Sequence, residues 1–427
     1  MTQQHSAILS ESLDGNELSL TPNPNRALGK TALWGSFFFE RLMYYGIRSI
    51  LILFLLNVKN ITTEESQIGY GLLFSLVAVG YIIMGPLTDK YLKQKNAVLI
   101  GFALCLAGLL IAHLSTSNIL FWGGLGLICL GSPAIDLNLY VLTGRLYSKA
   151  DPKRHSAFYA MTLVSFLSSF IMGGFATYLY MARPANILLM LSVLPLTGLV
   201  FFFILRKDIK EIELKDEKNA KNSGTDSPAS TKGWQKTVFF LALSAFVLVW
   251  ASKGFNVSAV SLAFDLSNFS TAIPATMLFS SGTAFLSLTA CIIMLAITAK
   301  LNAHRLPNFM SWSFAILAGA GLCWFVASEI LTSAFPLVLL GLAMGTVAEV
   351  MLRPMLYSHI TRISPTRWSS TAFGIAKGYM LLISNALTAV EYEGIVFGVA
   401  LAVVIGVTWF FIARKPELFG RLFKGVE

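Results

Sequence analysis

Long apolar runs alternate with short polar segments along this 427-residue chain. A helix that crosses a bilayer needs about 20 mostly apolar residues. The runs that meet this requirement lie at about 31–57, 68–88, 96–114, 118–145, 156–180, 185–206, 236–260, 273–299, 307–328, 333–358, 370–390 and 394–414. The pattern therefore predicts an all-α membrane protein with twelve transmembrane helices, in which Pro86, Pro133 and Pro354 are candidate kinks.

One polar segment divides these runs into two sets of six. Residues 207–235 are first charged and then rich in Ser and Gly, which is linker composition. We therefore expect two six-helix bundles, 31–206 and 236–414, with polar tails at 1–30 and 415–427. Six plus six helices about a central linker resemble the layout of major facilitator superfamily transporters, which bind substrate at mid-membrane between the halves.

The basic residues of the connecting segments predict the orientation. If the N-terminus is cytoplasmic, the loops on the opposite side contain only Lys59 and Arg183. Lys and Arg favour the cytoplasmic side, so both termini and the linker are expected there, in a bacterial inner membrane. The first 29 residues are polar and contain no compact apolar core with a cleavage site, so they predict a tail rather than a signal peptide.

Composition excludes several classes of protein. Only 13% of the residues are charged, against roughly 25% in soluble domains. The net charge of +10 does not indicate nucleic-acid binding, because the basic residues lie between apolar segments and not on one polar face. The four cysteines lie in apolar runs without metal-ligand spacing, and no enzyme motif is found. We expect no metal, no catalysis, and a monomer whose partners are the lipid bilayer and a small solute.

Charged side chains inside the apolar runs are the strongest functional signal. Each costs at least about 2.5–3.5 kcal/mol in a bilayer, so such residues tend to be functional. Five are basic and three acidic: Glu40, Arg41, Arg48, Asp136, Lys253, Glu349, Arg353 and Lys377. They are expected to line a water-filled cavity, where the excess of positive charge suits a substrate with a carboxylate or another anionic group.

The first predicted helix places its polar residues on one face. At about 100° per residue they fall within roughly 140° of arc: Glu40, Arg41, Tyr44, Tyr45 and Arg48. This face fits a substrate and coupling site. The alternative is a helix-packing network in which Glu40 only neutralises Arg41.

The other intramembrane charges leave similar alternatives open. Glu349 and Arg353 share a helix face, either as a functional pair or as a local ion pair that cancels charge. Asp136 either pairs with a base or titrates, and that tension is what a proton-coupling site requires. Lys253 and Lys377 either contact substrate, close a network, or extend to the membrane surface.

At these residues the chain resembles the proton-dependent oligopeptide transporter family. Residues 37–48, FFFERLMYYGIR, match its helix-one motif E-x-x-E-R-F-x-Y-Y-G-x-R except at Phe37 and Leu42. The stretch from Gly85, GPLTDKYLKQK, is similar to its G-x-x-x-D-R-Y-L-G-R loop, with Lys93 in place of Gly. The segments LGSPAIDLN, DPKRHSAF and EVMLRP, the last starting at Glu349, resemble further family motifs in the same order.

The resemblance implies proton-driven uptake of di- and tripeptides, with the proton as coupling ion and no cofactor. It also implies roles for Glu40 and Arg41 in coupling. Substrate contacts are implied for Tyr44, Tyr45, Arg48 and Glu349. The chain departs from the family at four positions, where Phe37 replaces Glu, Asp136 replaces Lys, Phe166 replaces Asn and Arg353 replaces Ser. We hypothesise that the changes at Asp136 and Arg353 compensate by pairing across the cavity.

The sequence therefore predicts a proton-coupled symporter that imports di- or tripeptides, or a related carboxylate-bearing solute such as an organic anion, by alternating access. The predicted coupling residues are Glu40, Arg41 and Asp136. The predicted substrate residues are Tyr44, Tyr45, Arg48, Lys253, Glu349 and Arg353. The alternatives are an exporter of drugs or metabolites on the same fold and, less favoured because no folded soluble domain is predicted, a membrane-embedded sensor.

Overall fold

A computed structural model describes residues 26–147, 153–222, 275–298, 306–329, 335–364, 366–387 and 393–414. Within these residues the regular elements are all helices. The long ones are α2 (Arg26–Asn57), α3 (Thr63–Leu87), α4 (Gln94–Leu114), α5 (Asn118–Arg145), α6 (Lys153–Ala182), α7 (Ile187–Asn222), α9 (Ala275–Thr298), α10 (Leu306–Glu329), α11 (Phe335–Ile363), α12 (Ser369–Leu387) and α13 (Glu393–Arg414). Each coincides with one predicted apolar run, and the remaining run, 236–260, lies outside the described residues.

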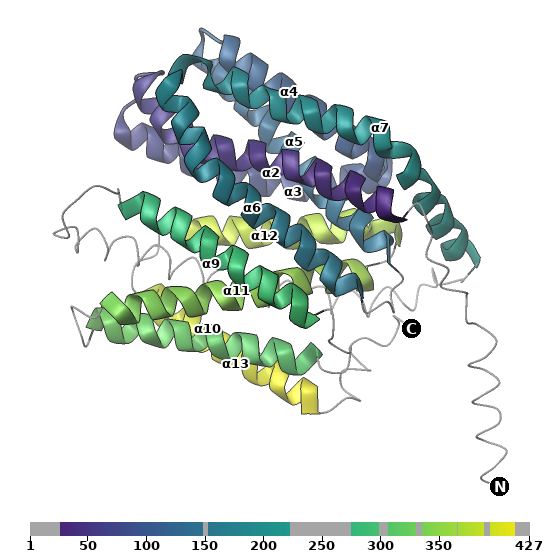
Figure 1. The fold of residues 1–427 in the computed structure, drawn as a ribbon, viewed down its shortest axis with the longest axis vertical. Helices are drawn as coiled ribbons and strands as arrows, with labels where there is room; N and C mark the ends of the chain where they lie inside the picture. Colours follow the sequence, from purple (N-terminus) through teal and green to yellow (C-terminus); the bar gives the residue numbers. More distant parts are fainter. Residues whose placement is uncertain are drawn as a thin grey trace.

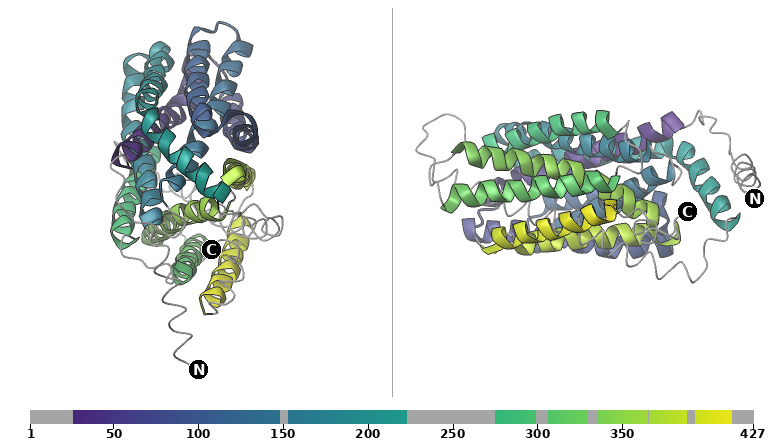
Figure 2. Two further views of the ribbon diagram at one scale, coloured as in Figure 1. Left: turned by 90° about the vertical axis from the view of Figure 1, so that its right-hand side faces the viewer. Right: turned by 90° about the horizontal axis from the view of Figure 1, so that it is seen from below.

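The helices form two groups that pack side by side. Figure 1 shows α2 to α7, in purple to teal, beside α9 to α13, in green to yellow. The helices of both groups run alongside one another in Figure 2. The groups meet where α3 packs on α12 and α6 packs on α9. We call these groups the N-half and the C-half.

Several helices of the N-half are long and apolar enough to cross a bilayer. Among the described residues, α4, α5, α6 and the spans Thr63–Leu92 and Pro184–Arg206 are long and apolar enough to cross a bilayer. The helix α2 is as long, but its apolar stretch contains Glu40, Arg41 and Arg48. Charges within an otherwise apolar helix need water or protein around them.

Helix α7 extends into the segment predicted as the linker. Helix α7 continues past residue 207 to Asn222, so the first part of the 207–235 segment is helical. The physical reason is that residues 207–218 are mostly Lys, Glu, Ile and Leu, which are compatible with a helix although they are polar overall. Charge alone therefore marked the end of the apolar run and not the end of the helix.

The connection from α3 to α4 positions an acidic residue at the contact between the halves. Pro86 lies near the end of α3, where it removes a backbone donor, and a π-helical turn, η1 (Thr88–Leu92), follows. This turn carries Asp89 and ends at Lys93, whose φ of 61° and ψ of 153° belong to a region that essentially only glycine adopts.

Glycines let α3 and α12 approach closely. A Cβ on Gly374 would lie 2.5 Å from the Tyr81 carbonyl oxygen, and one on Gly378 would lie 2.6 Å from that of Ala78. A Cβ on Gly85 would lie 2.8 Å from the Ser370 carbonyl oxygen. Larger residues at these positions would force the two halves apart.

Candidate functional site

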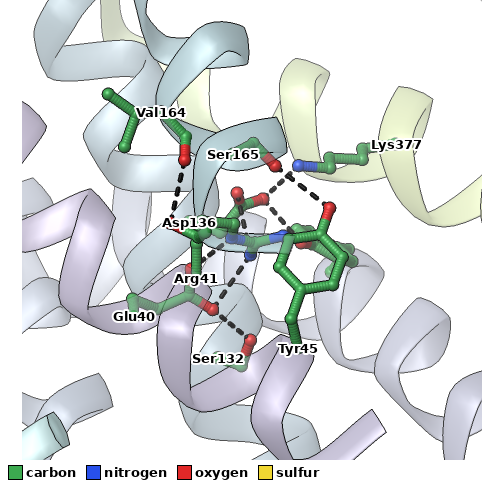
Figure 3. A network of polar contacts seen from close by, with 10 residues as sticks. Glu40, Arg41, Tyr45, Ser132, Asp136, Val164, Ser165 and Lys377 are labelled. Carbon is green, nitrogen blue, oxygen red and sulfur yellow. Dashed lines mark hydrogen bonds and ion pairs between the residues drawn. The ribbon is translucent and has the colours of Figure 1, made fainter. Parts of the chain in front are cut away.

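A buried network of ionisable side chains lies between the halves (Figure 3). On α2, the Arg41 guanidinium donates to both carboxylate oxygens of Glu40, at 2.5 and 2.9 Å. Its Nη2 atom is 3.0 Å from Oδ1 of Asp136 on α5. Ser132, one turn before Asp136, donates to Glu40 at 2.5 Å. Glu40 and Asp136 are fully buried, so these contacts replace the water that their charges would otherwise need.

The C-half contributes Lys377 to this network. Its ammonium forms an ion pair and a hydrogen bond with Oδ2 of Asp136, which also accepts a hydrogen bond of 2.5 Å from Tyr81. The Lys377 ammonium lies 4.9 Å from the Tyr140 ring centroid and 5.3 Å from that of Tyr357. Such rings favour a nearby cation by their negative faces.

Phe37 takes part in the network although it replaces the acidic residue of the family motif. Its side chain is 1% exposed, and the Arg41 guanidinium carbon lies 5.2 Å from its ring centroid. The Phe37 ring also packs edge-on against Tyr140 at 5.3 Å. An aromatic face beside Arg41 supplies part of the favourable electrostatics that a second carboxylate would supply.

The hypothesised pair between Asp136 and Arg353 is wrong in this structure. Asp136 pairs with Arg41 and Lys377, whereas Arg353 forms an ion pair with Glu349, four residues earlier on α11. The Glu349 and Arg353 side chains are 19% and 29% exposed, so this pair is only partly covered. The spacing on the helix brings these two residues together before any residue of another helix is needed.

The C-terminal half of α2 carries an exposed cation among aromatic rings. Arg48 donates from Nε to the Tyr70 hydroxyl at 3.3 Å, and its guanidinium lies 5.6 Å from the Phe74 ring centroid. Tyr44 packs edge-on against Phe74, and Tyr45 shares a hydrogen bond of 3.1 Å with Ser165 on α6. Arg48 is exposed in this structure, and contact with water or a polar solute costs a guanidinium far less than contact with lipid does.

Hydrogen bonds across the halves gather at the η1 end of the molecule. Asp89 accepts from the backbone N–H of Thr371 at 2.6 Å and of Ser370 at 3.3 Å, at the start of α12. Ser370 donates to Asn138, and Gln94 donates to Ser370, both at 3.1 Å. We call Asp89, Gln94, Asn138, Ser370 and Thr371 the end cluster. An acidic side chain at a helix N-terminus satisfies donors that the helix cannot satisfy itself.

The four charged side chains that meet here, Glu40, Arg41, Asp136 and Lys377, are ones that the sequence singled out, whereas Ser132 and Tyr81 are not. For Lys377 the sequence left closing a network as one of three alternatives, and Tyr81 was passed over because a tyrosine in an apolar run is ordinary. The intramembrane position of Lys377 was the available signal for its role. Lys253 lies outside the described residues. No group of His, Cys, Asp and Glu in the described part of the chain is arranged to hold a metal ion.

Comparison of the sequence with protein-family models identifies the family of this fold. The profile of the Major Facilitator Superfamily matches residues 33–389, which is most of the chain. The chain belongs to the Major Facilitator Superfamily. Such a chain is a multi-pass membrane protein, in agreement with its apolar helices.

Relatives confirm the predicted resemblance to peptide transporters within this superfamily. The chain is 30% identical over 157 residues to the peptide transporter YePEPT of Yersinia enterocolitica, covering 35% of this chain and 30% of that protein. It is 30% identical over 126 residues to dipeptide and tripeptide permease A of Chromobacterium violaceum, covering 28% of this chain and 25% of the permease. The matches thus span less than a third of these relatives.

The fold agrees over a much greater length. A crystal structure of a mutant peptide transporter POT in complex with alafosfalin superposes with a TM-score of 0.61. The alignment covers 92% of this chain and 95% of that one at 18% sequence identity. At this identity the agreement concerns the fold and not the substrate.

Proposed function

We propose that this protein is a proton-coupled symporter that imports peptides or related carboxylate-bearing solutes by alternating access. The observation that supports this most is the cross-half ion pair between Asp136 and Lys377. It joins an acid of the N-half to a base of the C-half, inside a network that also holds Glu40 and Arg41. The relatives named as peptide transporters supply the substrate class.

The chemistry of coupling follows from the loss of one negative charge. A proton on Asp136 would remove the anion that holds Lys377, and a proton on Glu40 would leave Arg41 to Asp136 alone. Either step weakens the attraction across the halves at mid-membrane and so favours their separation. Deprotonation restores the ion pairs and favours closure.

The orientation belongs to the same proposal. The helix ends and connections at the end-cluster side carry Lys90, Lys93, Arg145 and Lys153, so we assign that side to the cytoplasm of a bacterial inner membrane. The described conformation then has its cytoplasmic end closed by hydrogen bonds between the halves. Both termini are assigned to the cytoplasm. The expected partners of the protein are the lipid bilayer and the transported solute.

The test is uptake by the purified protein in proteoliposomes with an imposed pH gradient. We expect substrate uptake and proton entry to rise together when the outside is acidic, and a protonophore to abolish accumulation. Asp136→Asn should reduce gradient-driven accumulation to the level of simple equilibration. The control is Glu64→Gln, which removes an exposed carboxylate at the start of α3. Transport that ignores the gradient in the unmodified protein would overturn the coupling.

A further inference from the structure

The charges in the described part of the site balance except for one cation. Glu40 and Asp136 are matched by Arg41 and Lys377, and all four are buried in one network. On α11, Glu349 is matched by Arg353. With Arg48 included, the described part of the site contains three carboxylates and four cations. Its net charge is therefore about +1.

Arg48 is the cation that remains. Among the described residues, no carboxylate lies within ion-pairing distance of its guanidinium, and its neighbours are the Tyr70 hydroxyl and the Phe74 ring. A guanidinium carries five N–H donors, of which one reaches Tyr70, so donors remain for an anion. A carboxylate is the ligand that this planar group binds best in two-point geometry.

No carboxylate in the described part of the site is without a basic partner. An ammonium group entering the site would need a carboxylate, but each acid in the described site already holds a base. Burying an ammonium without an anion, or breaking an existing pair to supply one, is costly. A solute with a carboxylate and no amine avoids both of these free-energy costs.

We therefore propose that the preferred substrate is a net monoanion without a free amino group, such as an N-acylated amino acid or short peptide. This deepens the proposed function and rests on it. Arg48 holds the carboxylate, and the tyrosines around it, Tyr44 and Tyr70, contact the apolar body and its carbonyl groups. Arg353 acts as a specificity residue, because it occupies the carboxylate of Glu349 and thereby excludes a substrate amine.

Three matched probes separate charge from size: N-acetyl-dialanine (an anion), dialanine (a zwitterion) and dialanine amide (a cation). Binding is measured by the thermal stability of the purified protein, and transport by proton entry into proteoliposomes containing a pH-sensitive dye. We expect N-acetyl-dialanine to bind about tenfold or more tightly than dialanine, and dialanine amide to bind least. Only N-acetyl-dialanine should then drive strong proton entry.

Two variants assign the effect to residues. Arg48→Gln should weaken N-acetyl-dialanine binding about ten- to a hundredfold, because the charged partner of the carboxylate is lost. Arg353→Met should release Glu349 and improve the binding of dialanine amide relative to N-acetyl-dialanine. The unliganded melting temperature of each variant reports whether it is folded.

The outcomes separate this inference from the proposed symport. If dialanine or its amide binds as tightly as N-acetyl-dialanine and drives proton entry, the inference is wrong while the symport stands. If N-acetyl-dialanine binds preferentially but moves no protons, the inference stands and the coupling fails. If none of the three probes stabilises the folded protein, the inference is overturned.

Discussion

At the scale of single residues, two positions where the chain departs from the peptide-transporter motifs have clear physical consequences. Lys93 replaces a glycine of the loop motif and is held at a φ of 61°, where a side chain is strained. Asp136 replaces a lysine, and the structure supplies a lysine from the other half, Lys377, to pair with it. The first change costs stability locally, and the second is compensated across the molecule.

The strain at Lys93 gives a stability prediction. Lys93→Gly should stabilise the protein by about 1–3 kcal/mol, because glycine adopts this backbone conformation without penalty. A higher melting temperature in detergent checks it. Lys90→Gly, inside the neighbouring η1 turn, is the matched control and should lower the melting temperature. Equal effects of the two variants would contradict the strain.

The ion pair at Asp136 predicts non-additive variants. Lys377→Met should destabilise the protein by about 3–5 kcal/mol, because Asp136 keeps a buried charge with Arg41 as its remaining basic partner. The double variant Asp136→Asn with Lys377→Met should recover part of this loss, since neither charge remains. Thermal unfolding of both single variants and the double variant measures the coupling. Additive effects would show that the pair does not act as a unit.

At the scale of helices, the contact between α3 and α12 depends on glycine. Gly374 and Gly378 lie one turn apart on α12, and each would place a Cβ against a backbone carbonyl of α3. The contact therefore has no room for a larger residue, although neither glycine is required by the helix itself. These positions set how closely the halves approach near the level of Asp136.

Gly374→Val should consequently weaken closure at this contact. We expect the end cluster to separate and alkylating reagents to reach a cysteine introduced by Ser370→Cys several-fold faster, in a background without native cysteines. Gly71→Val on α3 is the control, because a Cβ there meets no atom within 4 Å. If both variants leave the alkylation rate unchanged, the close helix contact does not control closure.

At the scale of the whole molecule, the N-half and the C-half are connected in two places. Hydrogen bonds connect them at one end, and ion pairs connect them nearer the middle. The end cluster links η1, α4, α5 and the start of α12. The network of Glu40, Arg41, Asp136 and Lys377 lies further along the helices. In the proposed alternating access both connections must loosen, and each contains a carboxylate that a proton would neutralise: Glu40 or Asp136 in the network and Asp89 in the end cluster.

The end cluster gives a conformational prediction. Asp89→Asn removes the carboxylate that accepts from Ser370 and Thr371, so it should shift the population toward a state open at this end. Spin labels attached after Tyr91→Cys and Trp368→Cys should report a longer mean distance in the variant. Both positions are exposed. Glu64→Gln, on the other side of the molecule, is expected to leave the distance distribution unchanged.

The sequence by itself determined the helices and their approximate bounds, because an apolar run long enough to cross a bilayer has few structural alternatives. It also identified Glu40, Arg41, Arg48, Asp136 and Glu349 as special, since charge inside such a run is costly wherever it points. The helical spacing alone accounts for the pair between Glu349 and Arg353.

Only the tertiary structure decided which of these charges meet. Asp136 pairs with Lys377, which lies 241 residues away along the chain, and not with Arg353. No local pattern encodes that choice, because it depends on how α12 packs against α3 and α5. The same holds for Tyr81, whose hydroxyl becomes significant only when Asp136 is 2.5 Å away. Pairing across the halves is a property of packing, whereas the cost of each charge is a property of the residue.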